Sequence, residues 1–215
     1  MIKDLNAFLH EDFEGLVLEP PLFYSWTISI RFEIAPPMIP YYEKEYLQQT
    51  FDRAIALFKK VFDDNDEMLL VADVKTTCRD LFLQRRPLNV YLKYIKDKES
   101  RYKLQYHRFD DPDEEEMTTH RFVLPCAKNE IRYVQLLKAI CYEDFAHPST
   151  ILKNNPQSGY QVYFINVTQK LIYHLYDDRG CDVIAAEKET IRFLYEDCNE
   201  WILDYDRDRI ERLFN

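Results

Sequence analysis

Apolar and polar residues alternate without interruption from Trp26 to Ile34, and the pattern changes directly afterwards. A period of two is typical of a strand with one face in a core and the other in water. Between residues 43 and 62 the apolar side chains fall on one stripe of a helix, which predicts a long amphipathic helix. A buried strand is expected at 68–74. Strand, helix and strand in this order predict that the chain begins as a β-α-β unit.

The C-terminal third has the clearest pattern. Aromatic-rich strands are expected at 160–167 and 171–176, with a hairpin turn between them, and a further strand is expected at 181–185. Together they predict an antiparallel three-stranded meander. Gly180 stands in its second turn, where we expect it to supply a positive φ. Two helices are expected to follow, the last one capped by Asp206.

The middle of the chain is harder to interpret. Strands are expected at 103–109 and 121–124, one or two short helices at 78–98, and an amphipathic helix at 131–145. Helices and strands are interspersed without an internal repeat or a linker. We therefore expect a single α+β domain over residues 1–215, in which amphipathic helices flank a mixed or antiparallel sheet that includes the meander.

The charge balance excludes several classes of function. With a formal net charge of −10, the chain lacks the clustered Lys and Arg that nucleic acid and anionic membranes require, whereas a basic protein partner is favoured. Only three glycines are present, so neither a Walker loop nor a dinucleotide fingerprint is found, and no cofactor is predicted. Because no apolar run reaches the length of a membrane span and the first residues lack a secretory signal, we expect a cytoplasmic protein. The pattern does not define an oligomeric state.

The five cysteines and five histidines are scattered along the chain. No Cys-x-x-Cys spacing occurs, so the sequence predicts neither a disulfide framework nor a zinc site, and we expect reduced, mostly packed thiols. Cys181 is expected to be structural, because the neighbouring carboxylate of Asp182 raises the pKa of a thiol and disfavours the reactive thiolate.

The densest group of polar side chains lies in the turn between residues 176 and 182. The carboxylates of Asp177, Asp178 and Asp182 could hold a hard cation or act as a general acid and base. The guanidinium of Arg179 could bind an anionic group of a substrate. The alternative is that these aspartates accept hydrogen bonds from backbone N–H groups and bend the chain. We favour the alternative, because no histidine partner stands at a defined spacing.

Two further segments are candidate binding surfaces. One is an acidic run that ends in Glu114, Glu115 and Glu116. Such a run is typical of a solvated loop, and a docking surface is the second possibility. The other is an aromatic patch with Trp201 and Tyr205, which either covers the end of the core or anchors a partner.

Three motifs resemble the C-terminal signature of a bacterial family known as domain of unknown function 3885. They are Val162-Tyr163-Phe164-Ile165-Asn166, Leu175-Tyr176-Asp177-Asp178-Arg179-Gly180-Cys181-Asp182-Val183-Ile184-Ala185 and Trp201-Ile202-Leu203-Asp204-Tyr205. The resemblance spans roughly residues 23–214. It implies a bacterial, cytosolic origin and transfers no catalytic residue.

These observations favour a non-enzymatic, acidic protein-binding module of bacteria. Its expected form is an immunity- or antitoxin-like protein that masks a basic toxin, since complementary charge accelerates association. The candidate binding residues are those of the turn, the aromatic patch and the acidic run. The alternative from a different class is a small metal-assisted hydrolase that uses the Asp177–Asp182 turn.

Overall fold

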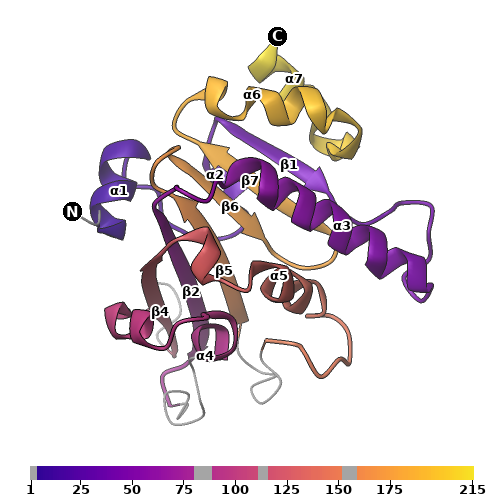
Figure 1. The fold of residues 1–215 in the computed structure, drawn as a ribbon. Coiled ribbons are helices and arrows are strands. Elements are labelled where there is room, and N and C mark those ends of the chain that lie inside the picture. The colour runs from indigo at the N-terminus through magenta and orange to yellow at the C-terminus, as the bar shows by residue number, and fades with distance from the viewer. Residues whose placement is uncertain (1–3, 80–88, 111–115, 152–158) are drawn as a thin grey trace.

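The computed structural model describes residues 4–79, 89–110, 116–151 and 159–215. Its strands form one antiparallel seven-stranded sheet in the order β1-β7-β6-β5-β2-β4-β3 (Figure 1). The predicted α+β class and the C-terminal meander, β5-β6-β7, are therefore confirmed. The strand bounds are β1 Ser29–Glu33, β2 Met68–Thr77, β3 Gln105–Asp110, β4 Met117–Cys126, β5 Gly159–Asn166, β6 Leu171–Leu175 and β7 Gly180–Ala185.

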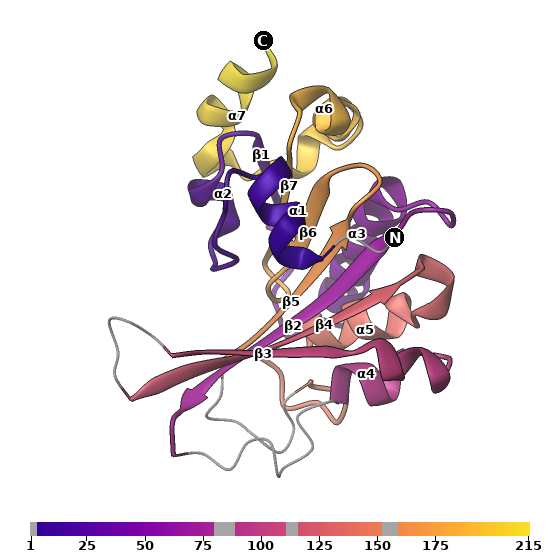
Figure 2. The same cartoon turned by 90° about the vertical axis from the view of Figure 1, so that its left-hand side faces the viewer.

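Helices cover both faces of this sheet (Figures 1 and 2). Helices α3 and α5 lie on one face, and the N-terminal segment with α1 lies on the other. The helix bounds are α1 Leu5–Asp12, α2 Leu22–Ser25, α3 Lys44–Val61, α4 Asn89–Tyr94, α5 Tyr133–Cys141, α6 Lys188–Asp197 and α7 Arg207–Phe214. Residues 80–88, part of the region predicted to form short helices, lie outside the described residues.

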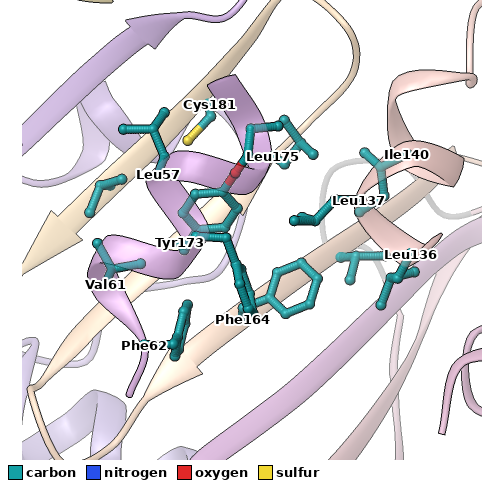
Figure 3. Close-up of a cluster of buried hydrophobic side chains, with 14 of the residues drawn as sticks. Leu57, Val61, Phe62, Leu136, Leu137, Ile140, Phe164, Tyr173, Leu175 and Cys181 are labelled. Atoms are coloured by element: carbon teal, nitrogen blue, oxygen red, sulfur yellow. The ribbon is translucent and has the colours of Figure 1, made fainter. Parts of the chain in front are cut away.

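The larger core lies between the sheet and helices α3 and α5 (Figure 3). Phe58 of α3 packs edge-on against Phe164 and Tyr173, with ring centroids 5.0 and 5.6 Å apart. The Tyr173 hydroxyl donates a 2.9 Å hydrogen bond to the carbonyl oxygen of Ala54, which satisfies it inside the core. The apolar stripe predicted at 43–62 is therefore the face that α3 buries.

The prediction that one face of the first strand is in water was wrong. The side chains of Ser29 and Arg31 on that face are largely buried, because residues 20–26 cross over them. Ser29 Oγ donates to the carbonyl oxygens of Phe23 and Trp26, at 3.1 and 2.9 Å. Alternation in a strand shows that its two faces differ. It does not show whether another segment of the chain covers the polar face.

The predicted β-α-β unit is present in an interrupted form. Strands β1 and β2 are linked through α3 and run parallel, because four antiparallel pairings separate them. The whole meander is inserted between them, so they are not neighbours. The order of the elements was predicted correctly. The pairing of the strands could not be predicted from the local pattern, because it depends on contacts with residues far along the chain.

Gly180 does not adopt the predicted positive φ. It is required for space instead, because the phenol ring of Tyr176 packs where a Cβ atom would lie. A Cβ there would also be 2.9 Å from the carbonyl oxygen of Phe32. The glycine therefore permits a close approach of the hairpin to β1.

Candidate functional site

A pocket opens where β6 separates from β5 at one end of the meander. The pairing of β5 with β6 ends at Tyr163 and His174, whereas β5 itself continues back to Gly159. The 176–180 turn diverges from this end of β5 and leaves a pocket of about 500 Å³. Its walls come from residues 20–21, Arg31, 143–144, 159–161, Tyr176, Asp177 and Arg179.

Asp177 uses both of its carboxylate oxygens within the turn. One oxygen accepts a 2.7 Å hydrogen bond from the backbone N–H of Arg179, and the other pairs with the Arg179 guanidinium. The carboxylate raises the pKa of Arg179. This local pairing is the arrangement expected of an aspartate that bends the backbone.

Asp178 points instead toward the first turns of α3. It accepts a 2.6 Å hydrogen bond from the hydroxyl of Tyr46 and is almost completely buried. Burial raises the pKa of Asp178, and the charge of Asp177 adds to this effect, whereas the Tyr46 hydroxyl opposes it. The hydrogen bond fixes the turn to the N-terminal end of α3.

The structure separates Asp182 from the other two aspartates of the turn. Asp182 is completely buried, receives Arg31 Nε at 2.8 Å and Nη2 at 3.2 Å, and accepts a 3.0 Å hydrogen bond from the N–H of Phe23. Burial disfavours the charged form of Arg31, but the Asp182 carboxylate outweighs it and raises the pKa of the guanidinium. Asp182 thus fastens the N-terminal segment to the sheet and does not line the pocket.

The nearby imidazole and thiol are both in uncharged forms. His174 is completely buried, and burial followed by the charge of Arg31 lowers its pKa to about 3. Its Nε2 atom is 2.8 Å from Oε1 of Gln161, which lines the pocket. Burial raises the pKa of Cys181, and the Asp182 carboxylate adds to the effect. Neither group is poised as a base or a nucleophile.

Three carboxylates gather at the turn, and two of them, Asp144 and Asp177, also line the pocket. Ligand oxygens of Asp144, Asp177 and Asp178 lie within 4.8 Å of one another. Asp144 is exposed and lies 3.6 Å from Arg179 Nη2. We refer to these three residues as the acidic cluster. Its two buried members already accept hydrogen bonds from Arg179 and Tyr46.

The remaining predicted residues lie away from the pocket. Trp201 is partly buried against the core, with the guanidinium of Arg53 5.5 Å from its ring centroid, whereas Tyr205 is 85% exposed. Glu116 is exposed beside β4. Glu114 and Glu115 lie outside the described residues.

Sequence reasoning missed the segment between β1 and α3. Residues 35–43, which we call the proline loop, contain three prolines and present Met38, Tyr41 and Tyr42 to solvent at 91%, 69% and 72% exposure. Its first residues are fixed to the turn, because the N–H groups of Ile34 and Ala35 donate to the carbonyl oxygen of Arg179. From the sequence, the prolines were interpreted only as the end of a strand. The apolar residues between them were the signal that could have indicated an exposed binding loop.

These features define a small α+β protein whose antiparallel sheet is covered on both faces and carries a pocket at one end of its meander. The chain belongs to the family described as Domain of unknown function (DUF3885), whose model matches residues 5–206. It is 29% identical over 217 residues to the uncharacterized protein YnaE of Bacillus subtilis (strain 168), covering 94% of this chain and 98% of that protein. No solved structure matches.

The family match confirms the resemblance seen in the C-terminal motifs and begins closer to the N-terminus than the predicted residue 23. The N-terminal segment that covers the second face of the sheet is therefore part of the family's shared region. Among the described helices, none combines the length and the apolar character that a membrane crossing demands.

Proposed function

We propose that this protein is a binding module for a basic protein and that the proline loop is the centre of its interface. The exposure of Met38, Tyr41 and Tyr42 within one short loop carries this proposal. Tyrosine and methionine are enriched at interface centres, where an aromatic ring buries much area at a small entropic cost. Large apolar side chains gathered in this way on a monomer's surface commonly mark an interaction site.

The proline loop is held in shape before any partner arrives. Besides its attachment to the carbonyl oxygen of Arg179, it contains hydrogen bonds from Ile39 N–H to the Pro36 oxygen at 3.2 Å and from Glu43 N–H to the Pro40 oxygen at 3.0 Å. Prolines also restrict the backbone. A loop ordered in advance loses less conformational entropy on binding, which favours affinity.

The charges around the loop indicate what kind of partner fits. Asp177 and Asp178 of the acidic cluster lie on the turn to which the loop is attached, and Glu43 and Glu45 stand where α3 begins. The nearby cations are Lys44, Arg53, which donates to the carbonyl oxygen of Ala35, and Arg179, which is paired with Asp177. With a net charge of −10 over the whole chain, the long-range field attracts a basic surface and repels an acidic one.

A photo-crosslinking amino acid at Tyr41 or Tyr42 tests the proposal in cells that express the full chain. We expect adducts with a protein of basic isoelectric point at both positions. Tyr102 is the matched control, because it is 92% exposed but lies in the 3-10 turn Glu99–Lys103, outside the loop. Equal yields at Tyr102, or adducts only with acidic proteins, would overturn the proposal.

The same experiment separates the proline loop from the surfaces predicted by sequence. Crosslinkers at Glu116 and Tyr205 probe the acidic run and the aromatic patch, which stay predictions. Masking of a basic toxin is the finer role that the sequence predicts; it is supported if the adduct is the product of a neighbouring gene and the purified chain inhibits it.

Metal-assisted hydrolysis is the second candidate function, and the spacing of the acidic cluster favours it. A bound cation raises the melting temperature by mass action. The hydrolase therefore predicts a rise in Tm with Mg²⁺, Mn²⁺ or Ca²⁺ that Asp178→Asn abolishes. Our proposal predicts no rise, because a cation would have to displace Arg179 from Asp177.

A further inference from the structure

We infer that the pocket beside the turn receives an arginine side chain of the basic partner. This inference rests on the proposed function and adds to it the residue that anchors the complex. The pocket and the proline loop share the 177–179 turn: Arg179 lines the pocket with its side chain and binds the loop with its carbonyl oxygen. A protein that covers the loop is therefore placed to insert a long side chain into the pocket.

Within the described residues the pocket holds a carboxylate without a partner, which favours a cation as its ligand. Glu143 lines it and is half-buried, yet no donor or cation among the described residues contacts its carboxylate. The adjacent Asp144 adds a second negative charge, and burial together with this charge raises the pKa of Glu143. A cation beside them would relieve both the desolvation and the repulsion.

The cations that already line the pocket do not fill this role. Arg31 is held by Asp182 in a bidentate pair, and Arg179 is held by Asp177. Each is thus largely neutralised by its own carboxylate. Asp144 lies 3.6 Å from the same Arg179 guanidinium, so Glu143 is the carboxylate of the pocket that no cation among the described residues contacts.

The shape and the lining of the pocket favour arginine over lysine. A guanidinium presents a planar fork that can contact two neighbouring carboxylates at once, and its flat face stacks on aromatic rings. The rings of Tyr160 and Tyr176 contribute to the walls, and Pro20 and Pro21 form an apolar side. A volume of about 500 Å³ accommodates the long side chain together with bridging water.

Amide chemical shifts measured during titration with Nα-acetyl-arginine methylamide test the inference on the full chain. We expect saturable shifts at residues 159–161 and 176–179, with the isosteric neutral Nα-acetyl-citrulline methylamide binding at least about tenfold more weakly. The Glu143→Gln/Asp144→Asn double variant should weaken arginine binding by about tenfold or more. Equal shifts with citrulline, or no saturable shifts, would overturn the inference.

A matched variant controls for the loss of two negative charges. Glu200→Gln/Asp208→Asn removes two exposed carboxylates from the C-terminal segment and should leave arginine binding unchanged. Circular dichroism and Tm verify that both double variants are folded. If the two weaken binding equally, general attraction to an acidic chain explains the shifts, and the pocket is excluded.

Variants of the loop distinguish this inference from the proposed function. Tyr41→Ser/Tyr42→Ser should weaken the binding of the partner identified by crosslinking and leave the binding of the arginine probe unchanged. If the partner depends on the loop but the Glu143→Gln/Asp144→Asn variant binds it normally, the anchor is wrong and the proposed function stands. If no basic partner depends on the loop, the proposed function fails, and with it the assignment of the arginine to a partner.

Discussion

Every aspartate of the 176–182 turn has a structural hydrogen-bond donor. Asp177 accepts from Arg179, Asp178 from Tyr46, and Asp182 from both Arg31 and the backbone of Phe23. These pairs explain why a short segment concentrates so much charge: the turn must be joined to α3 on one side and to the N-terminal segment on the other. Arg179, the partner of Asp177, stands two positions away in the sequence, whereas the partners of Asp178 and Asp182 lie more than a hundred positions away.

Removing the carboxylate of Asp182 should destabilise the fold strongly. Among the described residues, Asp182→Ala leaves the largely buried guanidinium of Arg31 with the more distant carboxylate of Asp206 at 3.7 Å, so we expect the free energy of unfolding in urea to fall by about 3 kcal/mol. The double variant Arg31→Met/Asp182→Leu removes both charges and should recover much of that loss. A double variant as unstable as Asp182→Ala would show that shape, and not uncompensated charge, is responsible.

Two glycines give a matched pair for the close approach at the turn. Gly180→Ala places a methyl group against Tyr176 and should cost about 1–3 kcal/mol. Gly159→Ala meets only Lys75 Cβ at 3.7 Å, an ordinary contact, and should have little effect. Thermal unfolding of both variants measures the difference; similar stabilities would contradict the packing described for Tyr176.

His174 should make the protein sensitive to acid. Burial lowers its pKa from 6.5 to about 3, so the unfolded chain binds a proton that the folded chain does not between these values. Its neutral form therefore contributes stability above pH 6.5 that is lost as the pH falls, by about 1.4 kcal/mol per unit. The free energy of unfolding of His174→Phe should lack this part of the pH dependence; an unchanged slope would exclude His174 as its source.

At the scale of elements, periodicity predicted what each segment is, and long-range contacts decided what it touches. Helix α3 and the meander were predicted because their apolar positions recur regularly and are buried as the pattern requires. The covered face of β1 was missed because residues 20–26 supply the cover. The pocket was missed for a related reason, since it exists only where β6 ends before β5 does.

The N-terminal segment should therefore be as important to stability as the helices of the larger core. Phe13 is completely buried between the rings of Phe8 and Trp26, each with a centroid 5.2 Å away. We expect Phe13→Ala to cost about 3–5 kcal/mol, comparable with Phe58→Ala in the larger core. The control is Phe109→Ala at a partly exposed position, which should lower the free energy of unfolding much less. A small effect of Phe13→Ala would show that this layer is dispensable.

The whole molecule combines an acidic net charge with a proline loop whose Met38, Tyr41 and Tyr42 side chains are exposed. Composition alone predicts the sign of the charge of the proposed partner, because that prediction depends only on counting residues. The place of contact could not be predicted in the same way. Tyr41 and Tyr42 differ from the buried tyrosines in their solvent exposure, which the fold determines. The candidate site moved accordingly from the turn to the loop and pocket attached to it.

The most direct test uses the basic partner identified by crosslinking and measures its affinity for the full chain at several salt concentrations. We predict that Met38→Ser/Tyr41→Ser/Tyr42→Ser weakens binding by about 100-fold, or close to 3 kcal/mol, mainly through faster dissociation. Added salt should slow association of both forms in parallel, because the loop variant keeps every charge. Binding that is unchanged by the triple substitution, or insensitive to salt, would contradict the account.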